Sequence, residues 1–338
     1  MEAMRETARV LVAPGKGILA ADESTGTIGK RFDQIGVDSN EETRRAYRQM
    51  LFTTPGVGDH ISGAILYDET IRQRADDGTR FTELLEKAGV IPGIKVDLGA
   101  KPLAFFPGET VTEGLDGLRE RLAEYRELGA RFAKWRATYF IGEETPTEFA
   151  VLANGHAMAR YAALCQEAAI VPIVEPEVLM DGDHDLAACE TATGRALEVL
   201  FTQLLEHRVD LSGTLLKVNM VLPGKDAADQ VDDAAIADTT LRTLMAYVPK
   251  DVPGVVFLSG GMSDEEATSR LNEMNRRDEA PWQLSFSYGR ALQQPALKAW
   301  GGAAENVEAA QAALAHRARM NGLARSGEWS TSMEDEAA

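Results

Sequence analysis

The sequence predicts an α/β fold, a (β/α)₈ TIM barrel, from three observations. Short apolar runs of strand character alternate with longer stretches of helical spacing. The runs are apolar on both faces, as in a parallel sheet covered by helices. Eight such runs fit within 338 residues, a length that suits one large barrel. A doubly wound open sheet is the alternative architecture.

The expected strands are runs rich in Ile, Val, Leu, Phe and Ala, and most end in polar or charged residues. Parallel strands that are buried on both faces have this composition. In chain order the runs are Gly17–Asp22, Ile61–Asp68, Gly93–Asp97, Ala130–Thr138, Ile170–Glu177, Gly213–Val221, Gly254–Ser259 and Gln283–Tyr288.

Helical spacing fills most of the segments between these runs. Leu115, Leu118, Leu122 and Tyr125 share one face of a helix expected over Glu113–Leu128. A Ser followed three residues later by Glu has the pattern of a capping box, which begins a helix at Ser263. The other helices are expected over Glu41–Leu51, Pro146–Ala168, Asp185–Glu206, Asp232–Tyr247 and Glu305–Arg319.

The chain is expected to form one domain, because no internal repeat and no Pro/Gly/Ser-rich linker divides it. Residues 1–327 are assigned to the barrel with N-terminal and C-terminal extensions. The end of the chain, from Ser326 to Ala338, is polar and acidic, and no secondary structure is expected there. Residues 328–338 are therefore expected to be a flexible tail.

The charge balance excludes two classes of partner. The chain has 35 Lys and Arg against 53 Asp and Glu, a net charge of −18, whereas nucleic acids and anionic membranes attract basic surfaces. The N-terminus has no signal-peptide pattern, and no apolar run approaches the ~18 residues of a membrane span. Cys165 and Cys189 give no disulfide pattern, which suits a reducing compartment. A soluble, cytoplasmic protein is expected.

No cofactor is expected. The segment Ser24–Arg31 resembles a phosphate-binding P-loop, but it lacks the first Gly and the Ser or Thr that should follow Lys30. No G-x-G-x-x-G follows a strand, and the five histidines lack the spacing of a metal site. The segment Asp181–Asp185 lacks the Glu that completes a calcium loop, and a serine-hydrolase G-x-S-x-G elbow is also absent.

Charged residues stand at alternate positions inside the predicted strands. Period-two spacing places each pair on one strand face, and buried charges collect where a site needs them. In TIM barrels that place is the carboxyl end of the strands. Taken singly, each residue also fits a strand-end charge or a structural ion pair. The pairs are Lys95 with Asp97, Lys134 with Arg136, Glu175 with Glu177, and Lys217 with Asn219.

Lysine is unusual in these strands because the chain otherwise prefers arginine, with 25 Arg and 10 Lys. Lys95, Lys134 and Lys217 lie inside apolar runs. A desolvated lysine can lose its proton and attack a carbonyl, which arginine cannot do. A Schiff-base amine is one interpretation, and simple binding of anionic groups is the other.

Glycine-bearing turns follow the seventh and eighth predicted strands. Glycines let backbone N–H groups approach an anion, and many barrels hold a phosphate at these two positions. Arg290 can add a bidentate contact. A phosphorylated ligand is therefore predicted at Ser259-Gly260-Gly261 and Ser287-Tyr288-Gly289-Arg290.

These motifs together resemble the class I fructose-bisphosphate aldolases, in family order and from about Lys16 to Gly327. The resemblance implies a metal-free (β/α)₈ barrel, usually a homotetramer. It further implies cleavage of fructose 1,6-bisphosphate to dihydroxyacetone phosphate and glyceraldehyde 3-phosphate, in glycolysis and gluconeogenesis. The segments that carry it are Gly15–Gly26, Gly93–Asp97, Phe132–Arg136, Val171–Glu177, Gly213–Lys217, Phe257–Gly261 and Phe286–Arg290.

The resemblance also assigns catalytic roles. Lys217 is similar to the Schiff-base lysine, and the ammonium of Lys134 beside it is expected to favour the neutral amine by charge repulsion. Glu175 corresponds to the acid and base of carbinolamine formation and breakdown, with Glu177 orienting it or sharing a proton. Asp22 is similar to the residue that takes the proton of the C4 hydroxyl.

Two phosphate-binding sets follow from the same resemblance. Many relatives also carry a C-terminal tyrosine that assists proton transfer at C3, and the sequence Glu334–Ala338 has none. The C1 set is Ser259, Gly260, Gly261, Ser287, Gly289 and Arg290, and the C6 and hydroxyl set is Ser24, Thr27, Arg31, Lys95 and Arg136.

Two other functions remain open from the residues. A different Schiff-base barrel, such as a transaldolase or an aldolase for a sugar with one phosphate, would use the same lysine but would not need two phosphate sets. A catalytically silent barrel would be expected to have lost Lys217, Glu175 or Asp22, and all three are present.

Overall fold

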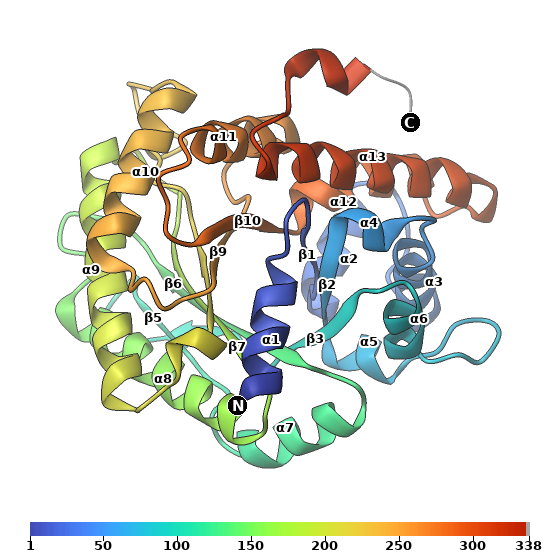
Figure 1. Ribbon diagram of the computed structural model, residues 1–338, viewed down its shortest axis with the longest axis horizontal. Coiled ribbons are helices and arrows are strands. Elements are labelled where there is room, and N and C mark those ends of the chain that lie inside the picture. The colour runs from blue at the N-terminus through green and yellow to red at the C-terminus, as the bar shows by residue number, and fades with distance from the viewer. Residues whose placement is uncertain (336–338) are drawn as a thin grey trace.

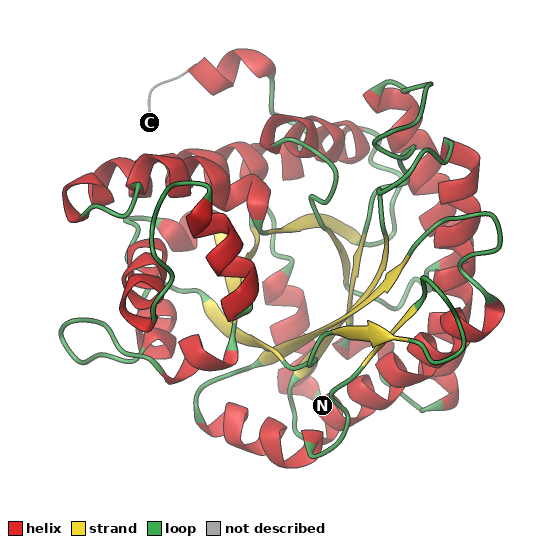
Figure 2. Cartoon of the chain, turned by 180° about the vertical axis from the view of Figure 1, so that it is seen from behind, coloured by secondary structure: helices red, strands yellow, loops and turns green. Residues whose placement is uncertain are grey.

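The computed structural model describes residues 1–335 and has a closed barrel of eight parallel strands at its centre, in the order β1-β10-β9-β8-β7-β6-β3-β2. Figure 2 shows the strands enclosed by helices. The predicted (β/α)₈ barrel is confirmed. The barrel strands are β1 (Gly17–Ala21), β2 (Ile61–Leu66), β3 (Ile91–Lys95), β6 (Phe132–Tyr139), β7 (Val171–Val178), β8 (Leu215–Val218), β9 (Gly254–Phe257) and β10 (Gln283–Tyr288).

Helices follow the strands around the outside. The predicted capping box is present, because Ser263 and Glu266 each accept a hydrogen bond from the other's backbone N–H. The helices are α1 (Glu2–Leu11), α2 (Thr25–Asp33), α3 (Glu41–Phe52), α4 (Val57–His60), α5 (Asp68–Arg72), α6 (Phe81–Lys87), α7 (Leu118–Glu127), α8 (Glu148–Glu167), α9 (Leu186–Glu206), α10 (Asp233–Tyr247), α11 (Asp264–Arg276), α12 (Arg290–Trp300) and α13 (Val307–Arg325), with short 3₁₀ turns η1 (Leu211–Gly213) and η2 (Ala304–Asn306).

Two local features differ from the expectations between β3 and β6. An antiparallel hairpin of β4 (Ala100–Pro102) and β5 (Thr110–Thr112) was not predicted. Helix α7 begins at Leu118 instead of Glu113, because Gly114 and Gly117 have φ angles of 128° and 65° that an α-helix cannot contain.

The amino end of the barrel is closed by α1. Met4, Ala8 and Leu11 are its buried side chains, and they belong to the same apolar cluster as Ile18 and Phe132 from the strands. Figure 1 shows α1, in dark blue, lying in front of the strands. The N-terminal extension therefore acts as a plug that completes the apolar part of the barrel interior.

The segment after α13 corrects the expectation that no secondary structure follows Ser326. A 3₁₀ helix, η3, spans Thr331–Asp335. Its Glu334 accepts hydrogen bonds from the indole of Trp329 and from Arg317 and lies 3.1 Å from His316 Nε2. A carboxylate expected in a flexible tail is therefore held by side chains of α13 and of the segment after it. The rest of the predicted tail, residues 336–338, lies outside the described residues. Within the described part of the chain, no helix is long and apolar enough to cross a bilayer.

Candidate active site

The inward face of several barrel strands changes from apolar to charged toward the carboxyl end. On β7, Val171 and Ile173 belong to the apolar cluster, and Glu175 and Glu177 follow on the same face two and four residues later. On β8, Leu215 is followed in the same way by Lys217. The predicted charges thus gather toward the carboxyl ends of the strands, at the mouth of the barrel.

A cavity of about 730 Å³ occupies this mouth. Every residue assigned a site role from the sequence lines it except Gly261, which stands at the end of the β9 turn with φ +78°, where an added Cβ would lie 2.8 Å from Met180. The predicted residues in the lining are Asp22, Ser24, Thr27, Arg31, Lys95, Lys134, Arg136, Glu175, Glu177, Lys217, Ser259, Gly260, Ser287, Gly289 and Arg290.

Two lysines and two carboxylates form a buried chain at the cavity floor. Lys217 Nζ lies 3.1 Å from Glu175 Oε1, and Lys134 Nζ lies 3.2 Å from Glu175 Oε2. Lys134 Nζ also lies 2.9 Å from Asp22 Oδ2. Glu175 therefore bridges the two ammonium groups, and Lys134 joins Glu175 to Asp22.

This arrangement shifts the proton affinities of the chain. Burial raises the pKa of Asp22, but the charges of Lys134 and Lys217 outweigh it and hold that pKa well below its usual range. The same balance of burial against the two lysines lowers the pKa of Glu175. Burial lowers the pKa of Lys134, and the charges of Asp22 and Glu175 reverse this and raise it above its ordinary value. At neutral pH both carboxylates are thus unprotonated, while Lys134 keeps its charge.

Other predicted charges pair at the cavity wall. Arg136 donates to the Glu177 carboxylate, and Lys95 Nζ donates to Asp97 Oδ1 at 2.6 Å. Burial lowers the pKa of Arg136, but Glu177 raises it above its ordinary value, so the guanidinium stays charged. These cations line the cavity beside, and not within, the Lys217–Glu175–Lys134 chain.

The turns after β9 and β10 present a set of polar groups to the cavity. Ser287 is 1% exposed, and its Oγ has no hydrogen-bond partner within residues 1–335. A Cβ at Gly260 would stand 3.2 Å from Glu177 Oε1, so the absence of a side chain lets this turn pass close to the carboxylate. Arg290 begins α12 directly after Gly289. A buried hydroxyl beside a cationic turn is suited to an anionic group.

A second polar set lies at the start of α2. Ser24 is the N-cap of this helix, and its Oγ accepts a 3.4 Å hydrogen bond from Thr27 N. Arg31, two turns further along, donates to Glu23. A Cβ at Gly289 would lie 3.7 Å from Arg31 Nη2, so this guanidinium stands between the two polar sets and does not belong to one alone.

Sequence reasoning missed the carboxylates and cations that support these groups. Glu23 and Asp97 line the cavity; Glu23 was not singled out, and Asp97 was named in its strand with Lys95 but given no site role. Arg48 pairs with Glu23 inside the protein, 3% of its side chain being exposed. A signal for Arg48 was present, because it shares the apolar face of α3 with Leu51, where a surface arginine is out of place.

The comparisons with known proteins agree with this geometry. The family model described as "Fructose-bisphosphate aldolase class-I" matches residues 3–338. A probable fructose-bisphosphate aldolase class 1 of Xanthomonas campestris pv. campestris is 56% identical over 330 residues, which is 97% of this chain and 99% of that protein. The cytosolic fructose-bisphosphate aldolase 4 of Arabidopsis thaliana is 55% identical over 93% of this chain and 80% of its own length.

The chain belongs to the class I fructose-bisphosphate aldolase family. A solved structure of the aldolase of Plasmodium falciparum, in complex with TRAP and a small-molecule inhibitor, superposes with a TM-score of 0.96 at 46% identity and covers 97% of this chain and 95% of that one. The aldolase reaction is the glycolytic aldol cleavage of fructose bisphosphate, through the metal-independent Schiff base that defines class I. The family predicted from the motifs is confirmed.

Proposed function

We propose that Lys217 is the nucleophile of this aldolase and that Glu175, Asp22, Lys134 and Glu177 carry its proton transfers. The observation that carries the proposal is the buried contact of Lys217 with Glu175, at 3.1 Å, inside a cavity lined by cations. A lysine that attacks a ketone must lose a proton, and a carboxylate at hydrogen-bond distance is the group to receive it.

Imine formation follows from that contact. Lys217 Nζ attacks the C2 carbonyl of the open-chain ketose, the C–N bond forms, and a proton lost by the attacking nitrogen passes to the carbonyl oxygen, which becomes the carbinolamine hydroxyl. Glu175, having gained the proton of Lys217, returns it to this hydroxyl, which leaves as water. The lowered pKa of Glu175 supports its starting as a carboxylate. Lys134, beside Glu175, offsets the charge that moves with the proton.

Cleavage uses the other end of the buried chain. Asp22 accepts the proton of the C4 hydroxyl, the C3–C4 electron pair moves into the iminium, and glyceraldehyde 3-phosphate leaves. The remaining enamine takes up at C3 a proton equivalent to the one that Asp22 gained, which returns Asp22 to its carboxylate form. Water then hydrolyses the imine to release dihydroxyacetone phosphate and free Lys217. The depressed pKa of Asp22 supports its being an unprotonated base at neutral pH. Glu177, paired with Arg136, lies next to the β9 turn, where it can orient Glu175.

The two polar sets account for the two phosphates in this proposal. The C1 phosphate is assigned to the β9 and β10 turns, with Ser259, Ser287 and Arg290 as side-chain donors. The C6 phosphate and the sugar hydroxyls are assigned to Ser24, Thr27, Lys95 and Arg136, with Arg31 between the two sets. Backbone N–H groups of Gly260, Gly261 and Gly289 complete the C1 set.

Borohydride reduction tests the nucleophile directly. The protein is reduced in the presence of dihydroxyacetone phosphate, digested, and analysed by mass spectrometry. A stable adduct on Lys217 supports the proposal, and an adduct on Lys95 or Lys134, or no adduct, contradicts it. Comparing kcat/KM for fructose 1,6-bisphosphate and fructose 1-phosphate then tests the assignment of two phosphate sets, because only the first substrate engages both.

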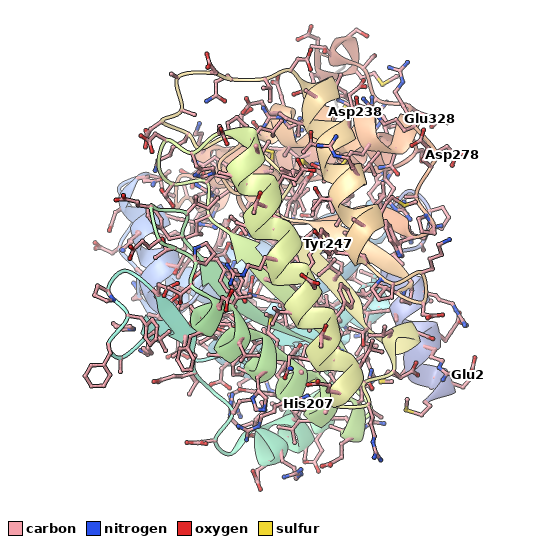
Figure 3. All side chains as sticks on the ribbon, turned by 90° about the vertical axis from the view of Figure 1, so that its left-hand side faces the viewer. Glu2, His207, Asp238, Tyr247, Asp278 and Glu328 are labelled. Atoms are coloured by element: carbon pink, nitrogen blue, oxygen red, sulfur yellow. The ribbon has the colours of Figure 1, made fainter. Side chains whose placement is uncertain are left out.

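The molecular organisation is also proposed. Residues 1–327 act as one barrel domain, and the protein works in the cytoplasm as a homotetramer. Exposed apolar side chains on the outer helices support association, among them Leu205 on α9 and Met245 and Tyr247 on α10, with 59%, 49% and 39% of their surfaces exposed. Figure 3 looks onto this face, with Tyr247 near its middle. Sedimentation equilibrium measures the mass, and a monomer at micromolar concentration contradicts the assignment.

A further inference from the structure

We infer that Glu23 is a positioning residue that, held by Arg48, aims Arg31 at a substrate phosphate. The inference rests on the proposed phosphate-binding role of Arg31 and adds the buried groups that control it. Glu23 and Arg48 come from separate elements, the turn after β1 and helix α3, and Arg31 comes from α2.

The Glu23 carboxylate is shared by three donors. Its Oε2 accepts from Arg48 Nη2 at 2.7 Å. Its Oε1 accepts from Gln293 Nε2 at 2.9 Å and also from Arg31 Nη1. Charge-assisted bonds of this kind are short and directional, so they fix the carboxylate in one orientation.

The three donors to the Glu23 carboxylate differ in how easily they can move away from it. Arg48 and Gln293 are 2% and 1% exposed, and Gln293 is itself fixed by Ala20 O at 2.7 Å and by Tyr47 OH at 3.1 Å. Arg31 lines the cavity, with 17% of its side chain exposed. Glu23 therefore has two permanent partners and one that can turn toward the substrate.

This asymmetry has a functional consequence. When Arg31 turns to a phosphate oxygen, Glu23 keeps Arg48 and Gln293, so its buried charge stays compensated. In the free enzyme, Glu23 holds the long side chain of Arg31 at the cavity edge beside Gly289. Substrate binding then costs less conformational entropy, because Arg31 is already partly ordered. A carboxylate without Arg48 could release Arg31 only by leaving a buried charge unpaired.

The same helix joins this cluster to the C1 set. Gln293 lies one turn after Arg290 on α12. The hydrogen bond from Gln293 to Glu23 therefore fixes the position of α12, which carries Arg290, relative to α2, which carries Arg31. The positions of Arg31 and Arg290 thus both depend on the buried Glu23 carboxylate.

The test is a double-mutant cycle on the full-length enzyme. Glu23→Gln keeps the shape but removes the charge, Arg31→Ala removes the aimed group, and the double variant combines them. We expect Glu23→Gln to raise KM for fructose 1,6-bisphosphate about fivefold with kcat within about twofold, Arg31→Ala to raise KM more, and the double variant to equal Arg31→Ala. Glu109→Gln is the matched control, because it removes another buried carboxylate that caps Thr147 outside the cavity, and it should leave KM unchanged.

Each outcome decides a different statement. Multiplied effects in the double variant, or an unchanged KM in Glu23→Gln while Arg31→Ala raises it, overturn the inference and leave the Arg31 assignment standing. An unchanged KM in Arg31→Ala overturns both. If Glu23→Gln does not fold because Arg48 loses its partner, Glu23→Asp replaces it: this variant keeps the charge for Arg48 but shortens the reach to Arg31. The inference then predicts the same rise in KM, and wild-type KM overturns it.

Discussion

The two ends of the barrel interior are built from the same strands and have opposite character. At the amino end, Ile18, Phe132, Ile173 and Leu215 pack with α1 in an apolar cluster. At the carboxyl end, the next inward positions after Phe132, Ile173 and Leu215 are Lys134, Glu175 and Lys217, and they line a cavity of about 730 Å³. On β6 the change takes one step of two residues, from Phe132 to Lys134.

The difference shows how the fold keeps a charged site buried. Four ionisable side chains at the floor of the mouth are costly to desolvate, and their mutual pairing offsets only part of that cost. The apolar layer below and the helix that covers it supply the stability that the mouth lacks. Substitutions at the amino end should therefore change folding, and those at the carboxyl end should change catalysis.

Lys217 is where the largest catalytic effect is expected. Lys217→Met removes the amine that forms the imine and should lower kcat by at least about 10⁴-fold, because no neighbouring group can replace a covalent nucleophile. A coupled assay measures kcat, and circular dichroism checks the fold. Lys225→Met is the matched control, since Lys225 pairs with Asp181 at the exposed surface, and it should retain full activity.

A smaller catalytic loss is expected at Asp22. Asp22→Asn cannot accept the C4 proton and should lower kcat for cleavage about 10²- to 10⁴-fold with little change in KM. Asp181→Asn, which removes an exposed partner of a lysine, should not. Comparable losses in both variants would contradict the role of Asp22.

The depressed pKa of Asp22 also predicts how the difference in stability between the wild type and Asp22→Asn depends on pH. A carboxyl whose pKa is lower in the folded state stabilises the fold above its unfolded pKa, near 4, and the contribution is lost as pH falls through the folded value. The wild type should therefore exceed Asp22→Asn in unfolding free energy by more at pH 7 than at pH 3. Urea denaturation at the two pH values measures the difference, and an equal gap at both would remove the electrostatic explanation.

Much of this contrast could be predicted from the sequence, because it follows from period-two spacing within single strands. A charged strand end is predicted within a single strand by Glu175 and Glu177, or by Lys134 and Arg136, and no other element is needed for that prediction. The family motifs then assigned a role to each.

What the sequence did not reveal depends on contacts between distant segments or on very short elements. Glu23 lies within a recognised motif, but its partners come from α3 and α12. The β4–β5 hairpin has three-residue strands, too short for an alternating pattern, and β4 ends in a proline. The 3₁₀ helix η3 depends on Arg317, seventeen positions before Glu334.

The amino end should respond in folding alone. Leu11 on α1 is fully buried, and Leu11→Ala should reduce the free energy of unfolding by about 2–5 kcal/mol through lost burial and a cavity. Because α1 lies at the opposite end of the strands from the cavity, kcat and KM of the folded enzyme should stay within about twofold. Val10→Ala, on the same helix but 41% exposed, should cost well under about 1 kcal/mol. A large loss of kcat in Leu11→Ala would mean that the two ends are coupled.

The finest comparison is between two serines on one strand, Ser285 and Ser287 of β10, which share a face two residues apart. Ser285 Oγ donates to Lys16 O at 2.7 Å, so Ser285→Ala should cost about 1 kcal/mol of stability and leave KM unchanged. Ser287 lines the cavity, and its buried Oγ has no partner within residues 1–335. Ser287→Ala should therefore not destabilise the fold, yet it should raise KM for fructose 1,6-bisphosphate about tenfold by removing a bond to phosphate. Thermal unfolding measures the stability of both variants, and steady-state kinetics measures their KM. Ser285→Ala should change only the first quantity and Ser287→Ala only the second. If Ser287→Ala lost stability without changing KM, Ser287 would belong to the structural part of the barrel interior, and its hydroxyl would not belong to the phosphate site.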